Sequence, residues 1–175
     1  MEQKHIYLIG FMGAGKSTVA KALAKKTGLP VMEMDDIIAS RAGMPIREIF
    51  ATQGEGAFRK EEAALLAEIA DGEPAIVSCG GGLIKREDNI SVMHSSGTVV
   101  CLTASPETIL SRVAGDSSRP LLQGKKDIAS IAAMIAERVP LYERAYDFSV
   151  KVDGRTPEKI ADSILAALQQ KDRRM

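Results

Sequence analysis

The sequence has no tryptophan, and tyrosine and phenylalanine together make up only 4% of its 175 residues. It also lacks an excess of either charge, because 23 basic residues balance 23 acidic ones. Chains that bind nucleic acid or an anionic membrane through their overall field carry a clear basic excess. We therefore expect no nucleic-acid partner and no membrane partner, and any positive charge used in binding must be local.

Cysteine and long apolar runs are also scarce. The only two cysteines, Cys79 and Cys101, lie in short apolar segments, which favours buried free thiols over a disulfide or a metal pair. No apolar run reaches the roughly 18 residues of a membrane-spanning helix, and the first residues leave no room for a signal-peptide core. We predict a soluble, cytoplasmic monomer with one domain over residues 1–175.

A glycine-rich stretch, GFMGAGKST at residues 10–18, directly follows an apolar run. Its spacing, G-x-x-x-x-G-K-S, is typical of a phosphate-binding loop, whose glycines bring backbone N–H groups close to an anion. The N-terminus of the following helix would favour phosphate, with a lysine on the β- and γ-phosphates and a serine on Mg²⁺. The alternative is a plain turn capped by Ser17 or Thr18. The pattern predicts nucleotide contacts from Gly13, Ala14, Gly15, Lys16, Ser17 and Thr18.

Short apolar runs alternate with longer helical patterns along the chain. The runs at 5–9, 31–34, 75–78, 98–102 and 148–152 predict five strands. Several short helices are expected over 36–70, and a last helix over 156–168. Because the runs lack polar alternation, they predict an α/β three-layer sandwich with a central five-stranded parallel sheet. In such sheets, ligands bind at the carboxyl ends of the strands.

Polar residues follow two of the predicted strands. Glu33, Asp35 and Asp36 come at the end of the second strand, and Ser78 and a triple glycine at the end of the third. Carboxylates beside a Mg²⁺-nucleotide can hold metal-bound water or accept a proton from an attacking hydroxyl. Both aspartates can also be the negative charges that favour a helix N-terminus.

The chain resembles shikimate kinases over nearly its whole length. The matching stretches are GFMGAGKS at 10–17, MEMDD at 32–36, IFATQGEGAFRKEE at 49–62, SCGGG at 78–82, RPLL at 119–122 and RVPLYERAY at 138–146. The loop alone indicates a superfamily, whereas the set in this order is far more specific. The resemblance implies a P-loop kinase fold with substrate-binding helices at about 36–62 and a lid at about 113–126. It implies transfer of the ATP γ-phosphoryl group to the 3-hydroxyl of shikimate, with Mg²⁺, in aromatic amino-acid biosynthesis.

The resemblance also implies the substrate contacts. Arg59 and Arg138 correspond to two arginines that bind the substrate carboxylate, for which planar bidentate donors are suited. Either arginine alone would otherwise be read as part of a surface ion pair. Asp35 corresponds to the acid that binds the substrate hydroxyls and takes the proton. The implied catalytic group is Lys16, Asp35 and Arg119.

Further residues would shape the substrate pocket. Glu62 corresponds to a carboxylate that orients the first of these arginines, although a solvated helix charge is an open alternative. Phe50 and Phe58 either wall the pocket or fill the core. Gly80, Gly81 and Gly82 correspond to a loop whose backbone approaches the substrate. The alternative is that these glycines form only a flexible turn.

On the nucleotide side, Arg119 corresponds to a lid arginine that places positive charge on the transferring phosphoryl group. Arg112 resembles the residue that stacks on adenine. Arg155 and Pro157 resemble the opposite wall of the adenine site. The polar segment 115–126, which contains Arg119, is expected to be a mobile loop.

The resemblance implies a Mg²⁺ site with Ser17 as a direct ligand and with Glu33 and Ser78 acting through water. Glu33 departs from the family pattern, which has aspartate there. Its longer side chain can still reach a metal-bound water.

Two other classes of function are alternatives to shikimate phosphorylation. A gluconate or nucleoside monophosphate kinase of the same fold would keep the loop and lid but would not need the substrate set above. A non-enzymatic GTP-dependent switch would carry a D-x-x-G motif, and no aspartate in the sequence is followed by glycine three residues later.

Overall fold

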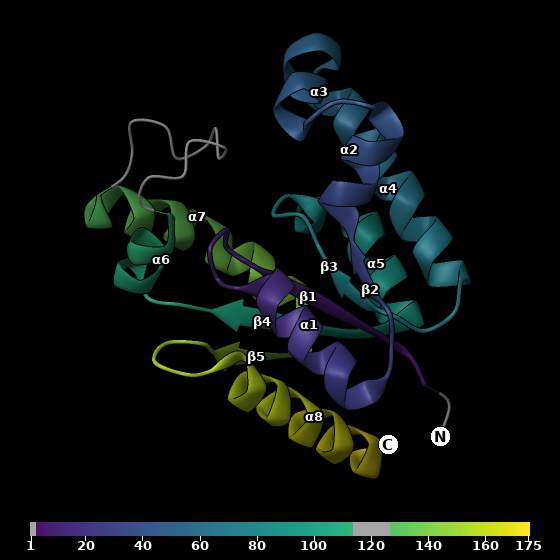
Figure 1. Cartoon of the computed structure of the whole chain (residues 1–175), viewed down its shortest axis with the longest axis vertical. Coiled ribbons are helices and arrows are strands. Elements are labelled where there is room, and N and C mark those ends of the chain that lie inside the picture. Colours follow the sequence, from purple (N-terminus) through teal and green to yellow (C-terminus); the bar gives the residue numbers. More distant parts are fainter. Residues whose placement is uncertain (1–2, 114–126) are drawn as a thin grey trace.

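A computed structural model describes residues 3–113 and 127–175 and contains a five-stranded parallel sheet (Figure 1). The spatial order β2-β3-β1-β4-β5 places the strand before the phosphate-binding loop at the centre. The predicted α/β class is confirmed. The strands are β1 (His5–Gly10), β2 (Val31–Glu33), β3 (Ile76–Ser78), β4 (Gly97–Thr103) and β5 (Phe148–Lys151).

Helices connect the strands, and the prediction of several short helices over 36–70 is confirmed. Gly43, with a φ of 68°, ends the first of them, and Gly54, with a φ of 85°, separates the next two. The helices are α1 (Lys16–Thr27), α2 (Met34–Ala42), α3 (Ile46–Gln53), α4 (Glu55–Asp71), the 3₁₀ helix η1 (Leu83–Lys85), α5 (Glu87–Ser96), α6 (Pro106–Val113), α7 (Ile128–Ala145) and α8 (Pro157–Arg174).

The central strand sends alternate side chains into two apolar layers. Tyr7 and Ile9 of β1 pack with residues of α4 and α5, whereas Ile6 and Leu8 pack with residues of α1 and α8. Successive side chains of a strand point to opposite faces, so a strand covered on both faces must be apolar throughout. This confirms the predicted three layers.

The second strand is shorter than predicted. β2 ends at Glu33, and Met34 opens α2, so Asp35 and Asp36 lie in the first turn of a helix. Met34 is fully buried, and the two carboxylates are favoured beside the positive end of the helix dipole. The prediction that the second strand runs to Met34 is wrong, whereas the alternative that both aspartates are charges at a helix N-terminus is confirmed. Glu33 and Asp35 therefore do not share a strand face.

The last helix is longer than predicted and reaches Arg174. It begins at Pro157, which tolerates the first helical position because its missing N–H would have no partner there. The Thr156 hydroxyl accepts a hydrogen bond from the Lys159 N–H at 3.3 Å and caps the helix.

The two cysteines, Cys79 and Cys101, are free and buried, as predicted. Burial raises the pKa of the Cys101 thiol to about 12 and raises that of Cys79 further. Both thiols are therefore inert side chains of the core.

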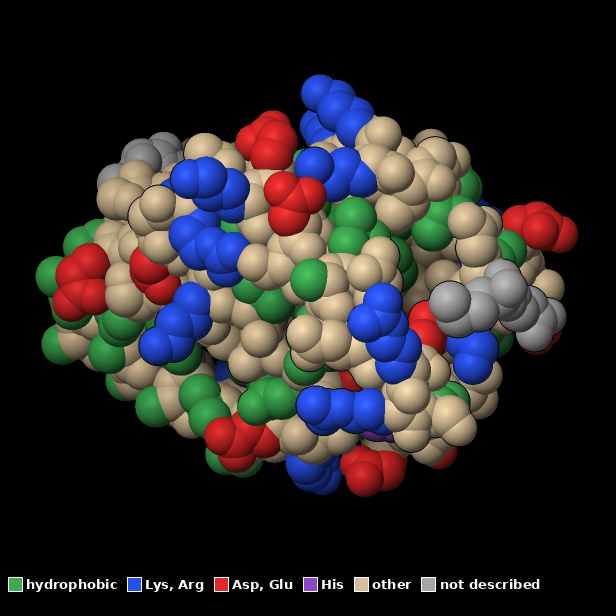
Figure 2. All heavy atoms as spheres, turned by 90° about the horizontal axis from the view of Figure 1, so that it is seen from below, with side chains coloured by type: hydrophobic (Ala, Val, Ile, Leu, Met, Phe, Trp, Pro, Cys, Tyr) green, Lys and Arg blue, Asp and Glu red, His purple; other side chains and the backbone are tan. Residues whose placement is uncertain are grey.

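Figure 2 shows lysine and arginine side chains interspersed with aspartate and glutamate on one face of the molecule. Within residues 3–113 and 127–175, no helix combines the length and the apolar character needed to cross a membrane.

Candidate active site

The turn between β1 and α1 requires its glycines. Gly10, Gly13 and Gly15 have φ values of 149°, 81° and 95°, which L side chains rarely adopt. A Cβ atom added at Gly10 would also lie 2.5 Å from the Leu102 carbonyl oxygen. The backbone therefore curls tightly just before the N-terminus of α1, which is the arrangement that binds phosphate.

Lys16, the first residue of α1, points back over this turn. Its Nζ donates to the Gly10 carbonyl oxygen at 2.7 Å and to that of Phe11 at 3.4 Å. Loss of hydration raises the pKa of the Asp35 carboxyl, and the Lys16 charge opposes that rise. The ammonium group thus lies between the loop and the acidic group of α2.

Ser17 and Glu33 meet beside the loop. The Ser17 hydroxyl donates to Glu33 Oε2 at 3.0 Å, and Glu33 is paired in register with the buried Ser78 across β2 and β3. Glu33 Oε1 is buried and has no hydrogen-bond partner among the described residues. A buried carboxylate oxygen needs a partner, and a hydrated cation can supply one.

The described residues contain no group of three or more histidine, cysteine, aspartate or glutamate side chains that could hold a metal ion. Mg²⁺ needs no such group, because it keeps several waters and uses one or two protein oxygens together with substrate phosphates. The Ser17 and Glu33 oxygens fit that ligand pattern.

The triple glycine after β3 is the point where the predicted substrate residues meet. A Cβ atom added at Gly80 would lie 2.8 Å from Asp35 Oδ1 and 3.0 Å from Glu62 Oε2. A Cβ atom added at Gly82 would collide with the guanidinium of Arg59. A side chain at either position would therefore displace the Asp35 or Arg59 side chain from the place that it occupies beside the glycine segment.

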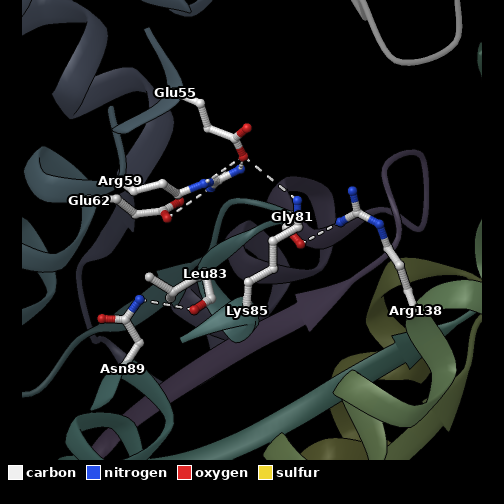
Figure 3. A network of polar contacts seen from close by, with 8 residues as sticks. All are labelled: Glu55, Arg59, Glu62, Gly81, Leu83, Lys85, Asn89 and Arg138. Carbon is white, nitrogen blue, oxygen red and sulfur yellow. Dashed lines mark hydrogen bonds and ion pairs between the residues drawn. The ribbon is translucent and has the colours of Figure 1, made fainter. Parts of the chain in front are cut away.

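Two guanidinium groups approach this glycine segment from opposite sides (Figure 3). Arg59 comes from α4, and Arg138 comes from α7 and donates through Nη1 to the Gly81 carbonyl oxygen at 2.6 Å. Arg138 also lies over the Phe11 ring, with its Cζ atom 5.9 Å from the ring centroid. The two cations thus meet at the glycine segment, whose first residue, Gly80, lies next to Asp35.

Arg59 is held by carboxylates and rings. Its Nη1 donates to Glu62 Oε1 at 2.9 Å, and Nη2 donates to Glu55 Oε1 at 3.3 Å. Its Cζ atom lies 5.2 Å from the centroid of Phe58 and 6.0 Å from that of Phe50. Phe58 is buried and Phe50 is 37% exposed, so Phe58 both fills the core and walls the site, whereas Phe50 lies at its rim.

Two carboxyls of this region, those of Asp35 and Glu62, have raised pKa values. Loss of hydration raises the pKa of Asp35, although its side chain is exposed, and the Lys16 charge opposes this. Burial raises the pKa of Glu62, which is fully buried, against the opposing charge of Arg59. A carboxylate with a raised pKa is the better proton acceptor, and Asp35 is the one that solvent can reach.

Three residues of the site were not predicted from the sequence. Glu55 accepts from Arg59 and lies 3.7 Å from Lys85 Nζ (Figure 3). Tyr142 lies one turn after Arg138, and its buried hydroxyl has no hydrogen-bond partner among the described residues. Burial raises the pKa of Tyr142 to about 12, against the charge of Arg138. Of these contacts, only the ion pair of Glu55 and Arg59 could have been predicted from the sequence, because the two residues are spaced i, i+4.

A cleft of about 250 Å³ lies beside the phosphate-binding loop and the start of α1. Arg112 forms part of its rim and donates through Nη1 to the Gly13 carbonyl oxygen at 3.1 Å. Arg112, Arg155 and Pro157, which were predicted to contact adenine, therefore all line this cleft. Its lining is Ala14, Gly15, Thr18, Val19, Arg112, Arg155, Pro157 and Ile160.

Arg119, the predicted lid arginine, and nearly all of the predicted lid lie outside the described residues. Their roles stay predictions.

A larger open hollow, of about 780 Å³, lies at the amino ends of the strands, at the opposite edge of the sheet. It includes His5 and Pro74 and none of the predicted site residues. Ligands of parallel sheets bind at the carboxyl ends, so this depression is not the candidate site.

A family model described as shikimate kinase matches residues 12–169. A curated shikimate kinase of Thermodesulfovibrio yellowstonii is 38% identical over 162 residues, which cover 93% of either chain. The solved structure of shikimate kinase from Acinetobacter baumannii in complex with shikimate superposes with a TM-score of 0.90 at 31% identity. That match covers 97% of this chain and 94% of the other.

A gluconokinase from Sinorhizobium meliloti also superposes, with a TM-score of 0.62 at 23% identity, over 95% of this chain and 92% of its own. At this level of identity the likeness shows a shared fold only.

Proposed function

The chain belongs to the shikimate kinase family, and we propose that it transfers the γ-phosphoryl group of ATP to the 3-hydroxyl of shikimate, giving ADP and shikimate 3-phosphate. One observation carries the choice of acceptor. Arg59 and Arg138 converge on the glycine segment beside Asp35, at the edge of the sheet that also holds the phosphate-binding loop. That arrangement suits a small acid with hydroxyl groups.

The two arginines bind and orient the substrate carboxylate. Guanidinium groups match a carboxylate in geometry and charge, and the Glu62 contact holds Arg59 in place. The acceptor hydroxyl then lies at Asp35, which takes its proton as the oxygen attacks phosphorus. The raised pKa of Asp35 favours that step.

The phosphate-binding loop positions the nucleotide. The backbone N–H groups after Gly10 and the N-terminus of α1 hold the phosphates, and Lys16 leaves the Gly10 carbonyl oxygen to reach them. Arg119, which lies outside the described residues, would add positive charge to the transferring group, as the family resemblance implies. Phosphoryl transfer depends almost entirely on such positioning and charge stabilisation.

Ser17 would hold Mg²⁺ directly, and Glu33 and Ser78 would hold it through water. When bound there, Mg²⁺ would supply positive charge that offsets the negative charge of the phosphates. The buried Glu33 oxygen without a partner fits this role, because a metal-bound water would satisfy it.

We further propose that the chain acts as a monomeric single domain in the cytoplasm, where a reducing environment suits its two buried free cysteines. Light scattering on the purified protein tests the oligomeric state.

Substrate choice is tested by an assay of ADP release with Mg²⁺ and ATP. Shikimate is expected to release ADP at a rate far above that of ATP alone, whereas gluconate and AMP are expected to give no increase. AMP has no carboxylate for the two arginines. Gluconate has one, but its open chain does not hold a hydroxyl at a fixed distance from the carboxylate as the ring of shikimate does. A response to gluconate or AMP without a response to shikimate would overturn the assignment.

Two variants of Glu33 test the proposed Mg²⁺ site. Glu33→Asp is expected to retain activity, because a water can take up the lost length. Glu33→Gln is expected to raise the Mg²⁺ concentration needed for half-maximal ATP binding by about tenfold, because a neutral amide replaces the charge beside Ser17.

Titration calorimetry of ATP at several Mg²⁺ concentrations measures this requirement without turnover. The exposed Glu107 at the start of α6 provides a control, Glu107→Gln, which is expected to change nothing. An unchanged Mg²⁺ response in Glu33→Gln would remove Glu33 from the metal site.

A further inference from the structure

The cleft of about 250 Å³ is built from parts that are far apart in the sequence. Its floor is the phosphate-binding loop and the start of α1, and one wall is Arg112 of α6. The other wall is Arg155, in the turn between β5 and α8, and Pro157, the first residue of α8. In Figure 1 this turn lies beside the segment that joins β4 to α6. The distance between the two walls decides whether a flat heteroaromatic base fits between them.

One side chain joins the two walls. Asp153, in the turn after β5, accepts through Oδ1 from the Ser105 N–H at 2.9 Å and from the Thr108 hydroxyl at 2.6 Å. Ser105 also caps α6, since its hydroxyl accepts from the Thr108 N–H at 3.2 Å. Asp153 therefore fixes the β5–α8 turn to the first turn of the helix that carries Arg112.

The ionised carboxylate of Asp153 accepts the hydrogen bonds that join the β5–α8 turn to the start of α6. Its hydrogen bonds to Thr108 and Ser105 hold the pKa of the Asp153 carboxyl down at about 2. The carboxylate is therefore ionised at neutral pH, where charge-assisted hydrogen bonds are stronger than neutral ones.

The opposite wall is rigid in its own right. Arg155 donates to the carbonyl oxygens of Lys151 and Lys159, each at 3.1 Å, and to the Ser163 hydroxyl. These three hydrogen bonds hold Arg155 to β5 and α8, and its side chain lines the cleft as a surface for a base. The wall is thus a preformed unit, and its placement against α6 depends on the residue that ties it there.

We propose that Asp153 is a positioning residue that sets the width of this cleft and thereby the affinity for the purine base of the nucleotide. This rests on the proposed function, because it takes the cleft as the site of the ATP base. Asp153 itself touches neither the base nor the phosphates in this scheme. It acts through Arg112 and Arg155.

Asp153→Ala removes both hydrogen bonds and is expected to raise both the KM and the calorimetric Kd for ATP about tenfold. The KM for shikimate and kcat are expected to stay within about twofold, because the substrate site and the phosphate-binding loop do not contact Asp153. Asp153→Asn keeps an oxygen acceptor at the same place but loses the charge, so it is expected to recover only part of the affinity.

Asp147 provides a matched control on the other end of the same strand. Just before β5, it accepts from the Val99 N–H at 2.7 Å and from Lys171 Nζ at 2.6 Å. Asp147→Ala therefore also loses two hydrogen bonds, but away from the cleft. It is expected to lower the melting temperature with no change in ATP affinity.

Thr108→Val gives a second variant in case Asp153→Ala does not fold. It removes one of the two donors while keeping the shape of the side chain, and it is expected to raise the KM for ATP about threefold. Equal ATP affinity in Asp153→Ala, Thr108→Val and the unaltered chain would overturn the inference. So would a loss in Asp147→Ala as large as that in Asp153→Ala. An unaltered chain that binds no ATP would overturn the proposed function as well, so the two failures are distinguishable.

Discussion

Lys16→Ala is expected to lower kcat by roughly two to three orders of magnitude, the loss typical when one preorganised charge is taken from a transition state. Lys16 is the side chain of the phosphate-binding loop that carries positive charge, and its Nζ already lies over the turn that binds phosphate. Phosphoryl transfer spreads negative charge over the transferred group, and alanine cannot neutralise it.

The fold is expected to survive this change, because Lys16 is only half-buried and its hydrogen bonds to the Gly10 and Phe11 carbonyl oxygens lie within the loop. Turnover and the melting temperature should therefore be measured on the same preparation. Lys21→Ala, at an exposed position further along α1, serves as the control and should keep full activity. Near-normal kcat in Lys16→Ala would remove this residue from the chemistry.

Arg138→Ala is expected to weaken shikimate binding by about 2 to 5 kcal/mol, the range for truncating one partner of a buried, hydrogen-bonded charge pair. Arg138 is half-buried, stands beside Gly81 and faces the same region as Arg59. Arg138→Lys should recover only part of the loss, because an ammonium group cannot bind a carboxylate through two parallel hydrogen bonds.

Calorimetric titration with shikimate measures this loss directly, and ATP affinity should stay unchanged. Arg144→Ala is a matched control on the same helix, since Arg144 is half-exposed and pairs with Glu87 at 3.3 Å on the surface. If Arg138→Ala binds shikimate as tightly as Arg144→Ala does, Arg138 is a surface residue and the carboxylate site is misplaced.

The sequence predicted those parts of the fold that depend on local chemistry. The turn from β1 into α1 was readable because only glycine satisfies the φ values of Gly13 and Gly15. The breaks at Gly43 and Gly54 were readable for the same reason. The end of β2 was predicted wrongly, because MEMDD suits a strand end and a helix start equally, and the burial of Met34 decided for the helix.

The candidate site depended on more than local pattern. Nothing in the spacing of Arg59 and Arg138 indicates that both reach one glycine segment, and only the family resemblance implied it. Contacts outside the quoted motifs were not foreseen, since Asp153 and Thr108 are 45 positions apart. Such pairs are brought together by the order β1-β4-β5 in the sheet, which the sequence alone did not predict.

The central claim is that the γ-phosphoryl group reaches the 3-hydroxyl of shikimate, and phosphorus NMR of the product tests it most directly. After reaction with Mg²⁺, ATP and shikimate, the product is expected to show one phosphomonoester resonance coupled to the proton on carbon 3, in amounts equal to the ADP formed. Inorganic phosphate in place of that resonance, or coupling to the proton of another carbon, would contradict the claim.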